Sequence, residues 1–303
     1  MIKEHKTGYV AILGLPNSGK STLLNALLGQ RLSIVTSKPQ TTRKRILGIL
    51  SEENHQIIFL DTPGILSPAY LLQEKMMEEV KTSLEDADVI ILIVDLKVDT
   101  KGENLFSQEF VKEKVFKSKK PKLLVLNKVD LITQDKVRVM INHFDTMKIF
   151  EEVVPISATQ NFNIQRVKEE IIRFLPEGPK LFPDDQLTDG NERFFVSEII
   201  REKILELYRD EVPYSSEVLI IDFKEREAGK NFISAEIVVE RDSQKAIIIG
   251  KAGIAIKKLG QVARESIEEF LQREVFLELR VKVRKKWRSD ENLLKSFGYD
   301  NKE

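Results

Sequence analysis

The chain has 303 residues, of which 42% are hydrophobic, and this length is sufficient for two domains with real cores. Its 48 lysines and arginines equal its 48 aspartates and glutamates, so no overall field attracts it to nucleic acid or to an anionic membrane, and such binding must come from local patches. The lack of cysteine excludes disulfides and thiolate metal sites, and no apolar run in the sequence is long enough to span a bilayer.

The first part of the chain, up to about Leu175, alternates short aliphatic runs with amphipathic stretches. Short aliphatic strands separated by helices are typical of a mostly parallel sheet that helices cover on both faces, so an α/β fold is expected. The segments 46–50 and 56–60 are joined by the short turn SEENH, which predicts one antiparallel pair. The expected strands are 9–13, 46–50, 56–60, 89–94, 122–126 and 153–156.

A phosphate-binding loop is predicted where the first strand meets the first helix. The stretch GLPNSGKS, residues 14–21, has two glycines separated by four residues and followed by Lys-Ser. Glycine allows backbone amides to turn toward phosphate oxygens, Lys20 reaches the outer phosphates, and the Ser21 hydroxyl is a ligand for Mg²⁺. The alternative is a glycine turn without a ligand, which the flanking strand and helix disfavour.

Two polar stretches between residues 40 and 64 are candidate partners of the phosphates. QTTR, residues 40–43, follows the first helix, and either Thr41 or Thr42 is expected to supply a second hydroxyl to Mg²⁺. DTPG, residues 61–64, follows the third strand, where Asp61 is placed to hold Mg²⁺ through water and the Gly64 amide to contact the terminal phosphate. Loss of that phosphate would then release the segment after Gly64. In the absence of the other motifs, DTPG would indicate only an ordinary turn.

The stretch NKVD, residues 127–130, predicts the base that the nucleotide carries. It directly follows the strand KLLVL. The Asp130 carboxylate at this place accepts two hydrogen bonds from guanine, whereas adenine would leave the charge unpaired. SAT, residues 157–159, follows the sixth strand, where a backbone amide is expected to meet the guanine oxygen, and its alternative role is a helix cap.

A proline-rich segment divides the chain. Three prolines and a glycine fall within residues 176–183, and prolines at that density exclude helix and disfavour sheet. We therefore expect a first domain over residues 1–176, a linker over 177–190 and a second domain over 191–303. The second domain is predicted to contain, in order, a helix at 191–208, strands at 216–223 and 232–239, two helices joined at residues 250–253, and a strand at 275–283. Six apolar residues are expected to share the buried face of the last helix: Leu259, Val262, Ala263, Ile267, Phe270 and Leu271.

The joint between those two helices is GKAG, which fits the Gly-x-x-Gly loop of a KH module. Such a loop clamps the backbone of about four nucleotides of single-stranded RNA. No Ser or Thr follows its lysine, so it is not a second triphosphate loop, and the isoleucines on either side are expected to anchor both helices in the core. Residues 245–264 carry five basic side chains and no acidic one, and residues 280–288 carry six more. The predicted RNA-binding residues are Gly250, Lys251, Ala252, Gly253, Lys257, Lys258 and Arg264.

Two alternatives stay open in this part of the sequence. The charged face and the glycines are also compatible with a solvated surface and a simple helical turn. Trp287, the single tryptophan, lies among basic residues beyond the last strand and either stacks on a base or covers the end of the domain.

In this order, GLPNSGKS, QTTR, DTPG, NKVD and SAT resemble the translation-factor-related GTPases, and with the KH-like tail they resemble the Era family of bacterial ribosome-assembly GTPases. The resemblance covers residues 9–175 closely and the rest less specifically. It implies a G domain followed by a type II KH domain of α+β architecture, and hydrolysis of GTP to GDP and phosphate with Mg²⁺. It further implies binding to small-subunit ribosomal RNA near its 3′ end, assistance to assembly of the small ribosomal subunit, and loose association with the inner membrane.

The resemblance also assigns roles to individual residues. Those implied in nucleotide binding are Asn17, Ser18, Gly19, Lys20, Ser21, Thr22, Asp61, Gly64, Asn127, Lys128, Asp130, Ser157 and Ala158. Those implied in catalysis are Lys20, Thr41, Thr42 and Gly64, and those implied in metal binding are Ser21, Thr41, Thr42 and Asp61.

One position departs from the Ras-like pattern. In Ras-like enzymes a glutamine just after DxxG orients the attacking water, and here Ile65 stands there. The resembled family shares this departure, so hydrolysis is still expected, with slow intrinsic turnover. Asn17 matches the asparagine that some related GTPases use as a ligand for K⁺, which would place positive charge near the transferred phosphoryl group. The alternative is that the Asn17 amide only stabilises the loop.

The leading hypothesis is therefore a GTP-hydrolysing switch that binds RNA, expected to be a cytoplasmic monomer with possible peripheral attachment to the inner membrane. The alternative is a GTPase adaptor whose C-terminal domain binds a protein or a membrane surface. A phosphate-loop kinase is disfavoured by NKVD.

Overall fold

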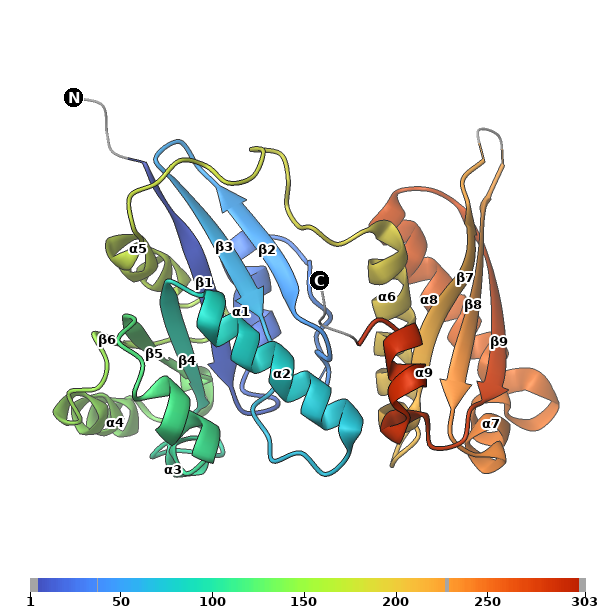
Figure 1. Ribbon diagram of the computed structural model, residues 1–303, viewed down its shortest axis with the longest axis horizontal. Coiled ribbons are helices and arrows are strands. Elements are labelled where there is room, and N and C mark those ends of the chain that lie inside the picture. The colour runs from blue at the N-terminus through green and yellow to red at the C-terminus, as the bar shows by residue number, and fades with distance from the viewer. Residues whose placement is uncertain (1–4, 37, 227–228, 300–303) are drawn as a thin grey trace. The chain divides into compact units, whose positions relative to one another are not determined.

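The computed structural model describes residues 5–36, 38–226 and 229–299, and it divides into two compact units (Figure 1). The first unit holds the chain up to Ala69 and Gln73–Asp189, and the second holds Tyr70–Leu72 and the chain from Gly190 onward. The outermost residues of the first and second predicted domains, 1–4 and 300–303, lie outside the described residues. Among the described residues, no helix combines the length and the apolar character needed to cross a membrane.

The first unit is built on a six-stranded sheet in the order β2-β3-β1-β4-β5-β6. Every neighbouring pair is parallel except β2 and β3, so the predicted mostly parallel sheet and its one antiparallel pair are confirmed. Each of the six expected strands is present. The strands are β1 (Lys6–Gly14), β2 (Ile46–Ser51), β3 (His55–Asp61), β4 (Val89–Asp95), β5 (Lys122–Asn127) and β6 (Glu152–Pro155), and the helices are α1 (Lys20–Leu28), α2 (Leu71–Asp86), α3 (Glu103–Phe106), α4 (Gln134–Thr146) and α5 (Ile164–Phe174).

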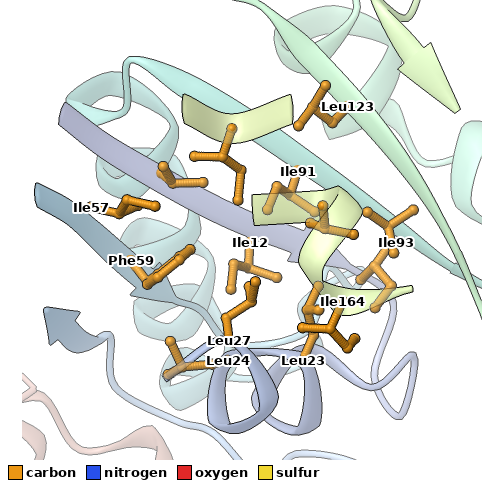
Figure 2. Packing of buried hydrophobic residues seen from close by; sticks show 14 of the residues in the cluster. Ile12, Leu23, Leu24, Leu27, Ile57, Phe59, Ile91, Ile93, Leu123 and Ile164 are labelled. Atoms are coloured by element: carbon orange, nitrogen blue, oxygen red, sulfur yellow. The ribbon is translucent and has the colours of Figure 1, made fainter. Parts of the chain in front are cut away.

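Alternate residues of the central strands enter two separate cores, one on each face of the sheet. In β1, Val10 and Ile12 point toward α1 and α5, whereas Ala11 and Leu13 point toward α2 and α4. Figure 2 shows the first of these cores, in which leucines of α1 meet isoleucines of β1, β3 and β4. Because both faces are covered, the central strands are apolar at nearly every position, and this produces the continuous aliphatic runs in the sequence.

The second unit has a three-stranded sheet in the order β7-β8-β9, with β7 antiparallel and β9 parallel to β8. The predicted order of helix, two strands, two helices and strand is confirmed. The elements are α6 (Glu192–Leu207), β7 (Glu217–Lys224), β8 (Asn231–Val239), α7 (Asp242–Ile249), α8 (Ile254–Leu271) and β9 (Val275–Val283). One face of the sheet packs against α6 and α8 in a single apolar cluster.

Two expectations about this core need correction. Phe270 is 39% exposed, because the buried face of α8 follows Leu259, Ala263, Ile267 and Leu271 at helical spacing and Phe270 lies at its margin. The isoleucines that flank GKAG do not all anchor the helices: Ile248 is fully buried, but Ile247 and Ile254 are 51% and 68% exposed.

A short helix that the sequence did not predict, α9 (Glu291–Ser296), follows β9. The Asp290 side chain caps it by accepting a hydrogen bond from the Leu293 amide. Just before it, the Trp287 side chain is completely buried, its Nε1–H donates to the Ser215 carbonyl at 2.9 Å, and its ring packs near Phe297. Of the two roles considered for Trp287, the structure supports covering the end of the domain.

We predict that Trp287→Phe destabilises the second unit by about 2 kcal/mol, because the smaller ring leaves a cavity and the buried Ser215 carbonyl loses its donor. Chemical denaturation followed by circular dichroism measures this loss. Ile221→Val is the control, since Ile221 is exposed and its shortening is expected to change the unfolding free energy by less than about 0.5 kcal/mol. Equal stability of Trp287→Phe and the unaltered protein would contradict the assigned role.

Candidate functional site

The predicted phosphate loop joins β1 to α1, and it borders a cavity of about 590 Å³ at the carboxyl end of the sheet. Parallel strands end at the same edge, so loops far apart in the sequence meet there. Of the predicted nucleotide-binding residues, the cavity is lined by Asn17, Gly19, Lys20, Ser21, Thr22, Gly64 and Lys128. Thr41 and Thr42 also line it.

Lys20 lies buried within the loop. Its ammonium donates hydrogen bonds to the Gly14 and Leu15 carbonyls, at 3.3 and 3.0 Å. Burial lowers the pKa of Lys20 to about 8, and the nearby Asp61 carboxylate opposes this effect. An anionic phosphate would favour the protonated ammonium, so the environment of Lys20 is suited to a phosphate ligand.

Ser21, Thr42 and Asp61 form an oxygen-only cluster beside Lys20. The Ser21 hydroxyl donates to Asp61 Oδ2 at 2.7 Å and lies 3.0 Å from Thr42 Oγ1, and Thr42 Oγ1 donates to the same carboxylate at 3.5 Å. Asp61 Oδ1 is buried without a hydrogen-bond partner among the described residues, and burial raises the pKa of this carboxyl group. A small hard cation prefers such oxygens and would stabilise the ionised carboxylate, so the residues fit Mg²⁺.

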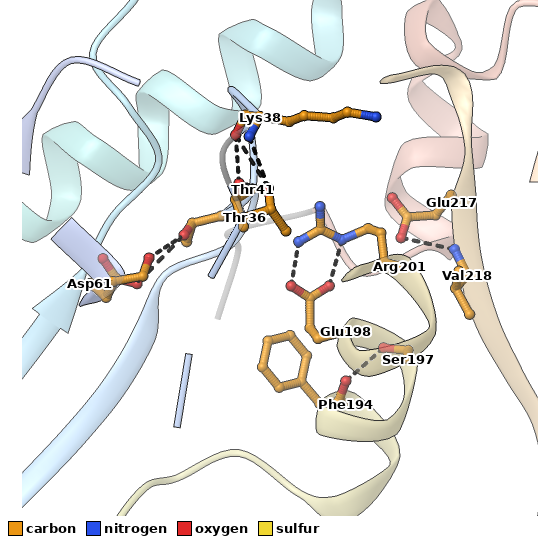
Figure 3. A network of polar contacts seen from close by, with 12 residues as sticks. Thr36, Lys38, Thr41, Asp61, Phe194, Ser197, Glu198, Arg201, Glu217 and Val218 are labelled. Atoms are coloured by element: carbon orange, nitrogen blue, oxygen red, sulfur yellow. Dashed lines mark hydrogen bonds and ion pairs between the residues drawn. The ribbon is translucent and has the colours of Figure 1, made fainter. Parts of the chain in front are cut away.

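The two threonines of QTTR have different surroundings. Thr41 Oγ1 donates to the Lys38 carbonyl at 2.8 Å and lies 3.0 Å from Thr36 Oγ1, as Figure 3 shows. Thr42 alone of the pair reaches Ser21 and Asp61. In this structure Thr42 lies in the oxygen cluster that fits Mg²⁺, whereas the Thr41 hydroxyl bonds within its own loop, and the choice of metal ligand between the two stays a prediction.

Gly64 brings the DTPG segment against the phosphate loop. A Cβ at this position would lie 2.6 Å from the Pro16 nitrogen, so only glycine allows this approach. The next residue, Ile65, donates its amide to the Gly14 carbonyl at 2.9 Å, and its side chain is 1% exposed in the core below. The side chain at the position of the Ras-like glutamine therefore points away from the cavity.

NKVD connects three loops through Asn127. Its Nδ2 donates to the Ser18 carbonyl at 2.9 Å, and its Oδ1 accepts from the Ala158 amide at 3.1 Å. The Ala158 amide thus has a protein acceptor, and its expected contact with guanine stays a prediction. Asp130 and Ser157 border a neighbouring cavity of about 510 Å³, in which Asp130 is exposed.

Asp95, at the end of β4, is a functional candidate that the sequence reasoning missed. Its Oδ2 accepts from the Lys128 ammonium at 2.5 Å, and the same ammonium donates to the Asn17 carbonyl at 3.0 Å. Asp95 is almost fully buried and lines the nucleotide cavity. Its signal was present, since an acidic residue directly after an aliphatic parallel strand lies at the edge where ligands bind.

In the second unit, GKAG forms a tight turn between α7 and α8. Gly250 and Gly253 have φ angles of 72° and 76°, in the left-handed region, and Ala252 also has a positive φ of 50°. A Cβ on Gly250 would lie 2.5 Å from the Ala255 Cβ, whereas a Cβ on Gly253 would meet nothing within 4 Å. The Gly253 face of the loop is therefore open to a ligand backbone.

A groove of about 600 Å³ lies between β9 and α8, the helix that directly follows GKAG in the sequence. Lys257 and Arg264 of the predicted RNA-binding set line it, together with apolar residues of β9 and with Lys230. Lys251 and Lys258 are exposed but do not line it.

Three of the six basic residues at 280–288 have acidic partners: Arg280 pairs with Glu278, Lys282 with Glu236, and Arg288 with Glu240. The second basic stretch is thus less available to phosphate than its sequence predicted.

Comparison with known proteins finds one family model that matches in each unit. Residues 9–128 match the family model described as 50S ribosome-binding GTPase, and residues 211–288 match the KH domain model. The chain is 47% identical over 300 residues to the chloroplastic GTPase ERA-like protein of Arabidopsis thaliana, covering 98% of this chain and 69% of the relative. It is 44% identical over 296 residues to the GTPase Era of Clostridium botulinum, covering 98% of this chain and 99% of the relative.

Two solved structures are similar over nearly the whole chain. One is Era in complex with MgGDPNP and nucleotides 1506–1542 of 16S ribosomal RNA, with a TM-score of 0.92, 43% identity, and coverage of 97% of this chain and 99% of that one. The other is a variant of Aquifex aeolicus Era bound to GDP.AlF4⁻, with the same TM-score and coverage and 42% identity.

We predict that Thr42→Val and Thr41→Val have different effects on the Mg²⁺ dependence of GTP hydrolysis. Thr42→Val removes a hydroxyl from the oxygen cluster, so the Mg²⁺ concentration that half-saturates GTP hydrolysis is expected to rise about tenfold or more. Thr41→Val, the matched control, leaves the cluster intact and is expected to change that concentration less than about twofold. Titration of Mg²⁺ at saturating GTP measures both. The reverse pattern would assign the metal to Thr41.

We predict that Asp95→Asn speeds the dissociation of GDP about tenfold or more, because Lys128 loses a charged acceptor that holds it over the phosphate loop. Stopped-flow displacement of a fluorescent GDP analogue measures the rate. Asp135→Asn, at an exposed position of α4, is the control and should not change it. If the double variant Asp95→Asn/Lys128→Met showed simply additive effects, Asp95 would not act through Lys128.

Proposed function

The chain belongs to the Era family of GTPases, and from this premise we propose that it couples hydrolysis of GTP to binding of small-subunit ribosomal RNA near the 3′ end. In this proposal the first unit is the G domain, and the second is a KH domain that holds the RNA. The protein would thereby assist assembly of the small ribosomal subunit. We also propose residues 1–176, 177–190 and 191–303 as the limits of G domain, linker and KH domain.

The observation that carries the proposal is the likeness over 97% of the chain to an Era structure whose complex contains both MgGDPNP and a 16S ribosomal RNA segment. The local geometry agrees with it. A KH loop with an open glycine and an adjacent groove bearing Lys257 and Arg264 offers backbone and cationic contacts to a single strand.

GTP hydrolysis proceeds with Mg²⁺, and the chain's own residues supply the remaining parts of the site. Ser21, Thr42 and Asp61 would hold the ion, which neutralises charge on the phosphates when bound. Lys20 would contact the outer phosphate oxygens, and the Gly64 amide would donate to the terminal phosphate. Because the Ile65 side chain lies in the core, another group must orient the attacking water, and slow intrinsic turnover follows.

We further propose that K⁺ supports hydrolysis through Asn17. This residue lines the cavity in a left-handed conformation with φ 63°, and Lys128 fixes its carbonyl. A monovalent cation held there would add positive charge next to the phosphate loop, where charge develops in the transition state.

The cellular setting is proposed on narrower grounds. We propose that the protein acts in the cytoplasm as a monomer. Peripheral attachment to the inner membrane remains a prediction that rests on the basic residues of the KH domain alone.

We predict that Gly253→Asp weakens binding to a 3′-terminal 16S ribosomal RNA fragment at least about tenfold, because a carboxylate on this face repels the RNA backbone. Affinity for GTP is expected to stay unchanged. Fluorescence anisotropy with labelled RNA and with labelled GTP measures the two affinities. Gly253→Ala is the matched control, since it has the same left-handed strain without the charge. Unchanged RNA affinity in Gly253→Asp would favour the adaptor alternative, in which the second domain binds protein or membrane.

We predict that GTP is hydrolysed several-fold faster in KCl than in NaCl at equal ionic strength, and that Asn17→Ala removes the difference. Phosphate release measured in both salts tests this. Equal rates in the two salts for the unaltered protein would contradict the K⁺ proposal, and a preserved difference in Asn17→Ala would assign the ion to another ligand.

A further inference from the structure

The proline-rich segment after α5 is not a free tether, because it is attached to the sheet of the first unit. Its anchor is Gln56, the second residue of β3, whose side chain is completely buried. Gln56 Oε1 accepts from the Leu181 and Phe182 amides at 2.7 and 3.0 Å, and Nε2 donates to the Phe182 carbonyl at 2.8 Å and to Ser51 Oγ at 2.9 Å. The amide thereby uses its two donors and both lone pairs of its oxygen.

Two more contacts hold the same segment. Phe182 packs against an apolar cluster of β2 and β3 residues, formed by Leu47, Ile49, Ile58 and Leu60. The Ile49 amide donates to the Leu187 carbonyl at 2.8 Å, and it does so on β2, the edge strand of the sheet. We call residues 181–187 the linker strap. It covers one edge of the β2–β3 hairpin with a backbone, a side-chain and an apolar contact.

The opposite end of this hairpin belongs to the nucleotide site. The β2–β3 ladder runs from the pair Ser51–Gln56, at the strap, to the pair Ile46–Asp61. Asp61 is part of the oxygen cluster, and Thr42 lies four residues before β2 begins. Six residue pairs span about 17 Å along a strand, so the hairpin joins the Gln56 anchor to Asp61, and Phe182 of the strap packs against residues that lie between them.

We propose that the β2–β3 hairpin transmits the nucleotide state to the linker strap, with Gln56 as the positioning residue that attaches the strap. Contacts of Thr42 and Asp61 with metal and terminal phosphate differ between the GTP and GDP states, and they therefore bias where the hairpin lies. Side-chain alternation makes register slippage costly, so the two strands of the hairpin move together. Their displacement strengthens or weakens the contacts that Gln56 and the β2–β3 apolar cluster make with the strap. The mobility of residues 181–187 then determines the mobility of the segment that leads to Gly190. This inference rests on the proposed GTP-linked control of RNA binding.

The test compares Gln56→Met with Gln165→Met, which changes an exposed glutamine of α5. Phe182→Ser provides a second variant that loosens the strap from its own side without altering the sheet. Amide hydrogen exchange of peptides covering 178–190 is measured on the full chain with GDP and with a non-hydrolysable GTP analogue. We expect exchange in this segment of the unaltered protein to differ about tenfold between the two nucleotides, and both strap variants to exchange fast in either state.

The same proteins are then titrated with the 3′-terminal 16S ribosomal RNA fragment. We expect the ratio of RNA affinities in the two nucleotide states to fall to within about twofold of unity in Gln56→Met and Phe182→Ser, with Gln165→Met unchanged. Identical exchange in both states of the unaltered protein would overturn the inference, and so would an affinity ratio that survives loss of the strap. Failure of every protein to bind RNA would instead refute the proposed function, while the exchange measurement would still decide the fate of the strap.

Discussion

The nucleotide site depends on two opposite charges that the fold buries beside each other, the Lys20 ammonium and the Asp61 carboxylate. Burial moves the pKa of each toward its neutral form, downward for Lys20 and upward for Asp61. Such groups are costly without charged partners, and a nucleotide with its metal supplies one for each. The surrounding structure holds the two in place: the phosphate loop encloses Lys20, and Ser21 and Thr42 donate to Asp61. The buried pair therefore fits a ligand that carries both a metal ion and phosphate.

The loops around this pair are connected to one another as well as to the ligand. Asn127 bonds to both the phosphate loop and the Ala158 loop, and Lys128 links Asp95 to Asn17. A displacement of residues 127–130 therefore shifts the phosphate loop through these hydrogen bonds. The β2–β3 hairpin connects the nucleotide site to the linker in a similar way, because its ladder ends at Asp61 on one side and at Gln56, which anchors the strap, on the other. In the proposed mechanism, the β2–β3 strand pair transmits the change of nucleotide state on hydrolysis to the linker.

The two glycine loops of the chain use the same property for different ligands. At Gly64 the lack of a side chain lets two protein segments approach each other, whereas at Gly253 it leaves space open on the protein surface. The first arrangement borders the cavity that is proposed to hold the nucleotide. The second lies between two helices beside a groove that has lysine and arginine on one wall and apolar strand residues on the other, which suits an RNA strand with both backbone and bases to bind.

The sequence by itself determined the order of the main strands and helices, apart from α9, and it predicted the phosphate loop, the metal carboxylate, the guanine motif and the KH loop. These features are local: each depends on residue types at fixed short spacing, such as the aliphatic strands that both cores require or the glycines of a tight turn. Tertiary structure placed Thr42 and not Thr41 in the oxygen cluster, turned Ile65 into the core, buried Trp287, exposed Ile254, paired half of the second basic stretch with acids, joined Asp95 to Lys128, and attached the linker to Gln56. In each case the deciding partner lies on another strand or loop, and which segments meet is fixed by the packing of the sheet and not by spacing along the chain.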